Sequence, residues 1–219
     1  MKAAIYSMQI DDLVIHLIRQ LYAEGDAAHD FDHVLRVTRL GEAIAGAEGA
    51  DVAVVRAAAL LHDVPVPGAT RKAHHLAAAD FAAEYLTSQG MSVAQVENVV
   101  HCIRSHRFRD QSIQPATLEA KCLYDADKLD SIGAIGVARA FSHSGSHHTR
   151  LWHQPMDAAP PDDAKPSGAE YTPVHEFVYK LRRLLPTLHT ATARAIGQQR
   201  HDFMSAFFAQ LDAEMMGLQ

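Results

Sequence analysis

The residues in this sequence that are best suited to chemistry are histidines and aspartates placed in apolar surroundings. His62 and Asp63 end the run AALLHDVPVPG at positions 58–68, in which small and apolar residues give way to two prolines. Val64 precedes a proline and is biased away from helical backbone angles, which places the pair in the last turn of a helix. The carbonyl groups at a helix C-terminus favour a nearby cation. The sequence repeats this dipeptide at His29-Asp30 and His201-Asp202, but only the middle copy ends a buried helix, where an unpaired charge is costly.

Two further segments carry matching residue types. His33 lies in the first turns of the amphipathic segment AHDFDHVLRV, and the stretch DADKLD places Asp125, Asp127 and Asp130 in an otherwise apolar helical region. Acidic groups in such a region must be paired, solvated or bound to a metal. The chain holds 15 histidines and 26 acidic residues, so it is well supplied with ligands for a metal ion.

The elements that must position these residues are helices. Apolar residues recur at helix spacing almost throughout, residues 51–64 are apolar on nearly every side, and Ser92 is placed to cap a new helix. We expect further helices at about 8–23, 73–89, 116–141 and 173–216, the last broken near Pro186. The segment 142–172 is rich in Gly, Pro, Ser and Asp, which predicts a long irregular loop, either disordered or a functional lid. The expected fold is all-α, one domain over residues 1–219, with the metal site within 33–127.

Composition limits the class of protein. The chain is 48% hydrophobic and 21% charged with a net charge of −6, which argues against a binder of nucleic-acid duplexes. We find no secretory signal and no segment of membrane-spanning length. Cys102 and Cys122 lie in apolar runs and are interpreted as reduced packing residues of a cytoplasmic protein. An apolar stripe near the C-terminus is assigned to core packing, with a homodimer contact as the alternative; it comprises Phe203, Phe207, Phe208 and Leu211.

These motifs together resemble a known family. His33, the run LLHDV, and DADKLD followed by GAIGVAR resemble the HD-domain superfamily of metal-dependent phosphohydrolases. The closest likeness is to a small bacterial group that opens with an HD-x-x-H element, here His29-Asp30-Phe-Asp-His33, and it extends through VVHCIRSHRF to the C-terminal helices. The resemblance implies that one divalent ion is bound by four residues, which are His33, His62, Asp63 and Asp127. Asp127 is chosen within DADKLD because the family's ligand directly precedes a basic residue.

The resemblance also implies the chemistry. Two nitrogen and two oxygen ligands suit Mn, Fe, Ni, Co, Zn or, less well, Mg, and we favour Mn. Such an ion lowers the pKa of bound water and polarises a phosphoryl oxygen. The implied substrate is a nucleotide that loses phosphate or pyrophosphate. Lys128 is placed to meet phosphate charge, while Arg71, Lys72 and Arg150 are further candidate phosphate contacts. For Arg71 and Lys72, a solvated surface position is the simpler account.

The remaining histidines are open to more than one interpretation. His101 and His106 are about 140° apart around a helix, so both cannot comfortably face one site. We assign His101, with Asp130, to the catalytic candidates, and keep a hydrogen-bonded core histidine as an equal alternative for His101; His106 is less favoured. His74 and His75 begin a helix, where exposure is the simpler account. Four histidines of the long loop look like a second metal cluster but are more often adventitious in such a segment, and they are His143, His147, His148 and His153.

Two other functions remain as alternatives. Some HD relatives are dinuclear iron oxygenases, and His75 and His101 would then bind the second iron. Members of the hydrolase group often carry an acidic and a basic residue shortly after the HD pair, whereas this chain has the turn VPVPGATRKAHH. That departure leaves the ligands intact but motivates a third hypothesis, a non-catalytic sensor of nucleotide or metal.

Overall fold

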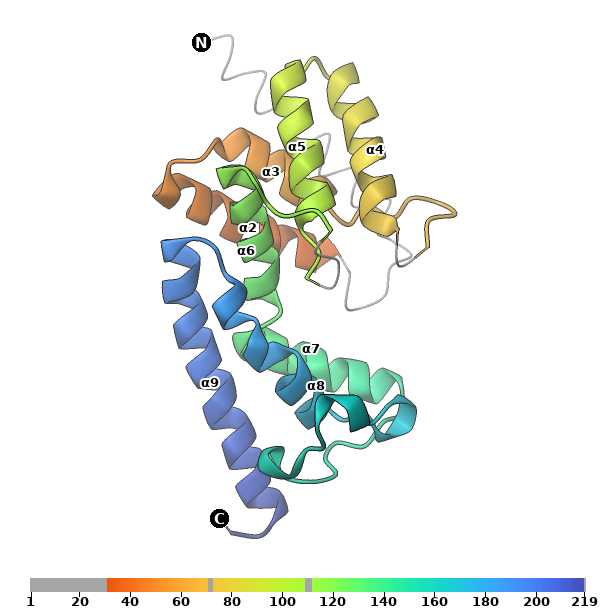
Figure 1. Ribbon diagram of the computed structural model, residues 1–219, viewed down its shortest axis with the longest axis vertical. Coiled ribbons are helices and arrows are strands. Elements are labelled where there is room, and N and C mark those ends of the chain that lie inside the picture. Colours follow the sequence, from red (N-terminus) through yellow and green to blue (C-terminus); the bar gives the residue numbers. More distant parts are fainter. Residues whose placement is uncertain (1–30, 71–72, 109–111, 219) are drawn as a thin grey trace. The chain divides into compact units, whose positions relative to one another are not determined.

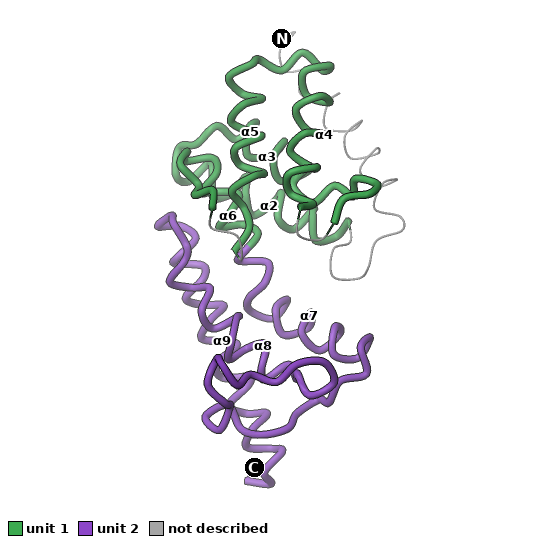
Figure 2. The backbone as a smooth tube through the Cα atoms, turned by 45° about the vertical axis from the view of Figure 1, so that its right-hand side comes forward, with its two compact units in different colours: residues 1–127 green, residues 128–219 purple. Residues whose placement is uncertain are grey.

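The computed structural model describes residues 31–70, 73–108 and 112–218, and the regular structure of these residues is entirely helical (Figure 1). The predicted all-α class is therefore confirmed. The chain divides into two compact units, residues 1–127 and 128–219, each described by itself below (Figure 2). That the chain forms one domain stays a prediction. The helix expected at 8–23 and the pair His29-Asp30 lie outside the described residues.

The first unit is a bundle of helices that encloses the candidate ligands. Its elements are α2 (Phe31–Glu48), α3 (Val52–Leu61), α4 (His74–Ser88), α5 (Val93–Ser105) and most of α6 (Leu118–Asp130). Helix α4 packs along α5, and α3 lies between α2 and α5 (Figure 1). The apolar periodicity of α2 and α5 explains this arrangement, since their buried residues lie on one face of each helix. Helix α3 is the central one, apolar on nearly all sides as its sequence predicts.

Polar caps fix where the helices of this unit begin. The side chain of Ser92 accepts the backbone N–H of Gln95 at the start of α5, as predicted, and Asp51 caps α3 by accepting the N–H groups of two residues in its first turn. Glu119, in the first turn of α6, connects α6 to two other helices, because one carboxylate oxygen accepts the backbone N–H of Asp51 at 2.9 Å and the other accepts the Asn98 amide at 3.0 Å. The starts of α3 and α6 are thereby held to the middle of α5.

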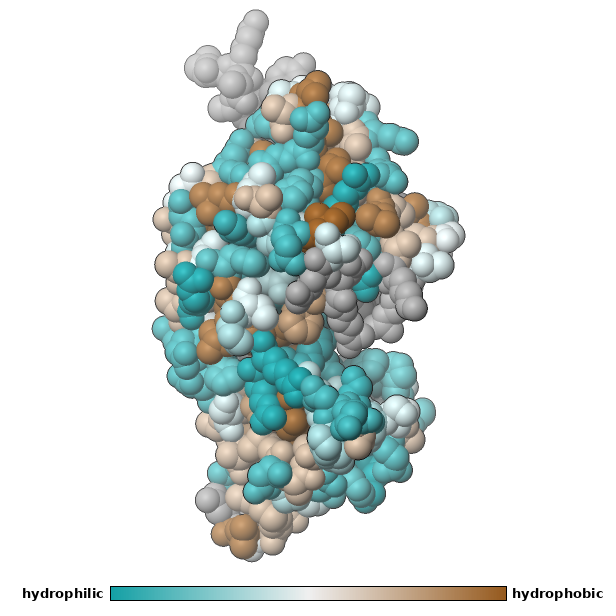
Figure 3. All heavy atoms as spheres, in the orientation of Figure 1, coloured by the Kyte–Doolittle hydropathy of each residue, from teal (hydrophilic) through white to brown (hydrophobic). Residues whose placement is uncertain are grey.

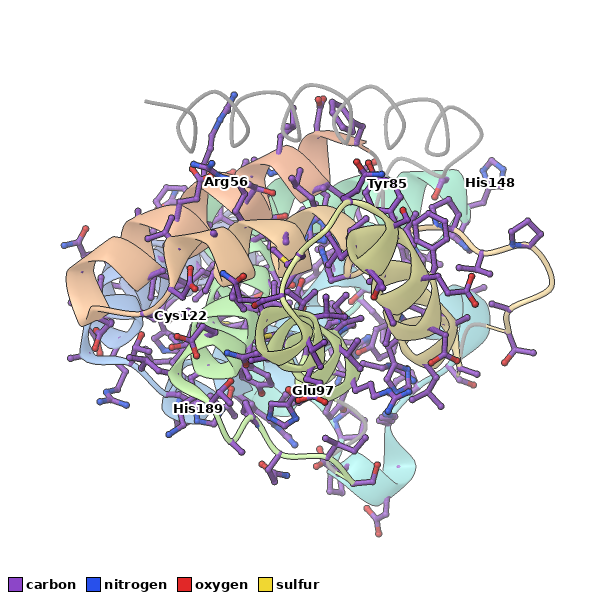
Figure 4. All side chains as sticks on the ribbon, turned by 90° about the horizontal axis from the view of Figure 1, so that it is seen from above. Arg56, Tyr85, Glu97, Cys122, His148 and His189 are labelled. Carbon is purple, nitrogen blue, oxygen red and sulfur yellow. The ribbon has the colours of Figure 1, made fainter. Side chains whose placement is uncertain are left out.

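The two cysteines are free and buried, as predicted. Burial raises the pKa of Cys122 to about 12, with Asp125 and other acidic groups adding to the effect. Cys122 is carried by α6 and is labelled in Figure 4. Both thiols therefore act as small apolar residues in this bundle.

The second unit contains longer and shorter helices joined by turns. Its elements are α7 (Gly133–Ser146), α8 (Pro173–Tyr179), α9 (Ala191–Met215) and the 3-10 helices η2 (Met156–Ala158), η3 (Asp162–Ala164), η4 (Gly168–Glu170), η5 (Leu181–Arg183) and η6 (Leu185–Thr187). Helix α7 packs against both α8 and α9. The predicted break near Pro186 extends over residues 180–190, where η5 and η6 replace regular helix.

The single helix expected over 116–141 is wrong. Helix α6 ends at Asp130, Ile132 is extended (φ −125°, ψ 171°), and Gly133 has a φ of 76° before α7 begins. A side chain at Gly133 would be disfavoured by that backbone angle and would also meet Arg200, because an added Cβ lies 2.9 Å from Arg200 Cγ. The glycine thus permits a sharp corner that the apolar periodicity of the sequence conceals.

The segment 142–172 is more ordered than the expected loop. Helix α7 continues to Ser146, which corrects the predicted start, and the rest is held against α9 of the same unit. Asp212, a buried residue of α9, accepts the indole N–H of Trp152 at 2.7 Å and the backbone N–H of Met156 at 2.8 Å. Tyr179 adds a third tie by donating to the carbonyl of Pro160. The indole N–H of Trp152 is therefore bound within this unit.

Replacing Asp212 by alanine is expected to lower the free energy of unfolding by about 1–3 kcal/mol, because two partly buried donors lose their acceptor. The matched control is Asp202→Ala on the same helix. Its exposed carboxylate accepts a hydrogen bond from the Gln198 amide, and its loss should change stability by no more than about 0.5 kcal/mol. Urea unfolding of both variants measures the difference. Equal midpoints would show that Asp212 does not anchor the segment.

The surface of the described residues is mixed. The face in Figure 3 shows hydrophobic residues interspersed among hydrophilic ones. Within the predicted C-terminal stripe, Phe208 is fully buried whereas Phe203 is about half exposed, so core packing accounts for only part of it. Over the residues that the structure describes, no helix has both the length and the apolar character needed to cross a membrane.

Candidate metal centre

His62 forms the centre of the site and follows directly on the last residue of α3. Its side chain is fully buried, and its Nδ1 lies 2.8 Å from the carbonyl oxygen of Ala59 in the preceding turn. A carbonyl only accepts, so Nδ1 carries the proton and Nε2 keeps its lone pair. Among the described residues, none forms a hydrogen bond to this buried Nε2. Buried polar atoms are nearly always satisfied, so this nitrogen is oriented for a partner of another kind.

Three further ligand candidates surround this nitrogen. His33 Nε2, from the first turn of α2, lies 3.8 Å from Asp63 Oδ2 and 3.6 Å from Asp127 Oδ1 in the last turn of α6. His62 Nε2 lies 3.6 Å from the same Oδ2 of Asp63. The His33 side chain is 2% exposed, and the side chains of Asp63 and Asp127 are each 12% exposed. The structure thus brings together the four residues that the sequence picked out from three distant segments.

The residues present fit a divalent cation. Bonds of about 2.0–2.2 Å place two ligand atoms of one ion no more than about 4.4 Å apart, and the nitrogen–oxygen separations of 3.6 and 3.8 Å fall inside that limit. The ligand atoms of His33, His62 and Asp127 all lie within 4.8 Å of one another. Two carboxylates in a site of low exposure also need positive charge nearby. The unsatisfied Nε2 of His62 is then explained as a ligand atom.

The second oxygen of Asp63 has its own neighbours. Its Oδ1 lies 3.1 Å from Nε2 of His74, the first residue of α4, and 3.6 Å from Nε2 of His106, which follows α5. His106 has its Nδ1 2.6 Å from the carbonyl of Ile103, an arrangement like that of His62. His62, Asp63 and His106 form a second group whose ligand atoms lie within 4.8 Å. Each carboxylate oxygen of Asp63 therefore has its own imidazole neighbours: Oδ2 faces His33 and His62, and Oδ1 faces His74 and His106.

The charge state of Asp63 follows from these contacts. Burial by itself would raise the pKa of its carboxyl group, but the neighbouring His62 and the contacts with His106 and His74 hold the pKa well below its usual range. Burial also lowers the pKa of His106, although Asp63 opposes that shift. Asp63 is consequently an anion at neutral pH, as a carboxylate ligand must be.

Two expectations about the histidines need correction. His74 and His75 are not simply exposed, because His75 is buried and His74 contacts Asp63. His106, which was less favoured, reaches the cluster, whereas His101 Nε2 accepts the backbone N–H of Ala116 at 2.9 Å. The argument that the two residues cannot both face one site holds, but the residue that faces it is His106, the C-cap of α5, and not His101. The sequence carries one signal for the end of this helix, because its apolar residues recur at helical spacing only as far as Ile103.

The other candidate residues have environments of their own. Lys128 directly follows Asp127 in α6 and is buried, while Asp130, 1% exposed, accepts the guanidinium of Arg139 at 3.0 Å. Arg150, in the second unit, is exposed with its Nη1 3.0 Å from Nδ1 of His153. Arg71 and Lys72 lie outside the described residues. The four histidines of the long loop are all exposed, in keeping with the simpler interpretation of them.

Comparison with known proteins identifies the class. The HD-domain family model matches residues 30–132, a range that contains all four candidate ligands. The chain is also 32% identical over 207 residues to the uncharacterized protein YpgQ of Bacillus subtilis (strain 168), covering 92% of this chain and 91% of YpgQ. The chain therefore belongs to the HD-domain superfamily.

Solved structures of relatives share the fold. The crystal structure of Bacillus subtilis YpgQ in complex with ADP superposes with a TM-score of 0.72 at 27% identity, covering 95% of this chain and 96% of that one. A predicted HD-superfamily hydrolase from an uncultured Thermotogales bacterium superposes with a TM-score of 0.65 at 28% identity, covering 93% and 92% of the two chains. Family and fold support, in general terms, a metal-dependent phosphohydrolase.

Proposed function

We propose that this protein hydrolyses nucleotides through a divalent ion bound by His33, His62, Asp63 and Asp127. The observation that carries the proposal is the buried Nε2 of His62, which no described residue satisfies and which lies beside two carboxylates and a second imidazole. A purely structural cluster would pair these groups by hydrogen bonds, whereas a metal site leaves lone pairs converging on one point.

The chain's own residues prepare the ion's surroundings. Ala59 fixes the tautomer of His62 by accepting its Nδ1–H, and an orienting bond of this kind is usual for histidine ligands. The bound ion would lower the pKa of a water molecule and polarise a phosphoryl oxygen. Lys128, adjacent to Asp127 in α6, is proposed to contact the phosphate as a point cation. Arg71, Lys72 and Arg150 remain proposed phosphate contacts, and His101 and Asp130 remain catalytic candidates.

A nucleotide is the proposed substrate class because YpgQ, a relative over nearly its whole length, has been crystallised with ADP. A nucleoside triphosphate would lose phosphate or pyrophosphate. Manganese is the proposed ion, since a mixed set of two imidazoles and two carboxylates suits it. The free, buried thiols of Cys102 and Cys122 suit a reducing compartment, and we include a cytoplasmic location in the proposal.

The test is product release from a nucleotide panel. Protein stripped with chelator and reloaded with Mn²⁺ is incubated with ribo- and deoxyribonucleoside di- and triphosphates, and phosphate and pyrophosphate are measured separately. Asp63→Ala is expected to lose at least about a thousandfold in turnover, because several kcal/mol of transition-state stabilisation leave with the ion. The matched control is His148→Asn, which removes an exposed histidine that projects from the second unit (Figure 4).

Either of two results would contradict the proposal. The first is equal turnover by Asp63→Ala and the unmodified chain on every nucleotide. The second is Mn²⁺-loaded protein that forms no product from any member of the panel. Product formed by the unmodified chain and by His148→Asn, but not by Asp63→Ala, would support it.

A dinuclear iron oxygenase is the second candidate, and one observation favours it. His62, Asp63 and His106 form a second group of suitable ligand atoms, so the second ion would involve His106 rather than the pair His75 and His101 suggested by the sequence. Iron analysis and oxygen consumption decide between the two candidates. Two irons per chain with oxygen uptake would favour the oxygenase, and one ion with phosphate release would favour the hydrolase.

A further inference from the structure

The two carboxylate oxygens of Asp63 face different partners. Oδ2 lies 3.8 Å from His33 and 3.6 Å from His62, both candidate ligands. Oδ1 instead lies 3.1 Å from His74 Nε2, within hydrogen-bond distance, and 3.6 Å from His106 Nε2. If Oδ1 is occupied by an imidazole N–H, only Oδ2 remains to bind an ion. The arrangement thus fixes which oxygen of Asp63 is the ligand.

We propose that His74 is a positioning residue that holds Asp63 Oδ1 through its Nε2–H, so that Asp63 binds the ion through Oδ2 alone. This inference rests on the proposed metal centre and adds a residue that neither the sequence motifs nor the family match single out. His74 donates from the first residue of α4, eleven positions after Asp63 in the chain. Donors to a ligating carboxylate restrict its rotation and so raise the affinity for the metal.

The contact between His74 and Asp63 also connects two helices, because His74 is the first residue of α4. The residue at the N-cap of α4, Ala73, makes no side-chain capping bond, so the helix starts without the usual polar tie. The bond from His74 to Asp63 connects that uncapped start to the end of α3. Helix α4 and the metal ligand are therefore linked directly, and the ring of His74, which is 31% exposed, closes the outer side of Asp63.

Divalent-ion affinity of the full chain is the measurement. Chelator-stripped protein is titrated with Mn²⁺ alone, followed by electron paramagnetic resonance of the free ion, for the unmodified chain, His74→Ala, His74→Gln and the control His148→Asn. His74→Ala should bind Mn²⁺ about 10–100-fold more weakly. His74→Gln should recover most of that loss, because its amide N–H can donate to Oδ1. The number of ions per chain should stay at one in every variant.

Unfolding of the metal-free proteins separates positioning from a general structural role. His74→Gln keeps the donor to Oδ1 and should unfold near the metal-free midpoint of the unmodified chain, whereas His74→Ala loses the tie to α4 and should unfold somewhat earlier. The weaker Mn²⁺ binding of His74→Ala should nevertheless persist under conditions in which the metal-free variant is fully folded. Unchanged Mn²⁺ affinity in His74→Ala would overturn the inference, and so would failure of His74→Gln to recover the lost affinity. If the unmodified chain binds two ions and His74→Ala loses one of them, His74 is itself a ligand and the inference is also wrong.

Asp63→Ala distinguishes this inference from the proposed function. If Asp63→Ala binds Mn²⁺ as the unmodified chain does, the metal centre itself is wrong. If Asp63→Ala loses the ion while His74→Ala keeps full affinity, the metal centre stands and only the role of His74 fails.

Discussion

Replacing His62 by leucine should abolish stabilisation by Mn²⁺ while leaving the metal-free protein nearly as stable as the unmodified chain. His62 is fully buried, and its Nε2 lacks a hydrogen-bond partner among the described residues. An unsatisfied buried polar atom costs about 1–3 kcal/mol, and an apolar side chain of similar size removes that cost. Loss of the Nδ1 bond to Ala59 opposes the gain by about 1 kcal/mol. Loss of the imidazole that helps to keep the neighbouring Asp63 ionised adds a further cost, so the metal-free variant should be slightly less stable than the unmodified chain.

The metal-bound state behaves differently. A ligand at 100 times its dissociation constant stabilises the folded chain by about 2.7 kcal/mol, which corresponds to a rise of about 5–10 °C in the melting temperature at this chain length. That rise should be present in the unmodified chain, should disappear on addition of chelator, and should be absent in His62→Leu. His62→Ala is the matched variant, because it removes the same ligand but leaves a cavity and lowers stability with and without metal.

Thermal unfolding with Mn²⁺ and with chelator measures both parts of this prediction. A melting temperature of His62→Leu that rises with Mn²⁺ as much as that of the unmodified chain would exclude His62 as a ligand. A metal-free His62→Leu protein that is less stable by several kcal/mol would show that the Nε2 of His62 is satisfied in the folded chain. Both results test the Nε2 atom of His62, on which the proposed function rests.

The candidate ligands were accessible from the sequence in two ways. His62 and Asp63 end an apolar helix before a proline, where burial and charge conflict. Asp127 shares that conflict with Asp125 and Asp130, and only the family resemblance singles it out. The contacts of His74 and His106 carry no such signal. His74 reaches Asp63 across the turn after α3, and His106 reaches it from the C-cap of α5. Such contacts depend on where helices end, which periodicity locates only approximately.

The difficulty of locating helix ends also explains why a single helix was wrongly predicted over residues 116–141, where the structure has α6 and α7. Ile132 and Gly133 lie in a stretch whose apolar residues keep the helical spacing, so the predicted helix extended through them. The positive φ of Gly133 and the nearby Arg200 of α9 are tertiary facts that the local pattern does not contain. The corner has a chemical consequence, because it brings Arg139 of α7 back to Asp130 at the end of α6. If α6 and α7 formed one continuous helix, Asp130 and Arg139 would be too far apart to make this contact.

Arg139→Ala should therefore be strongly destabilising, by about 3–5 kcal/mol. Asp130 is 1% exposed, and Arg139 Nη1 donates to its Oδ2 at 3.0 Å and to its backbone carbonyl at 3.2 Å. Removing Arg139 takes away the cation that hydrogen-bonds to this buried carboxylate, and breaking a buried ion pair from one side is strongly destabilising. Removing both charges is less harmful, so the double variant Asp130→Asn, Arg139→Ala should be more stable than Arg139→Ala alone.

These variants also decide what Asp130 does. Its sequence position beside the ligand made it a catalytic candidate, but its pairing with Arg139 favours a role in holding the corner between α6 and α7. If that role is correct, Asp130→Asn should keep nucleotide turnover per metal-bound molecule at temperatures where it is folded, while its unfolding midpoint falls. Turnover that drops at least about a hundredfold in a folded, Mn²⁺-loaded Asp130→Asn protein would instead place Asp130 in the reaction, because general acid–base catalysis contributes at least that factor.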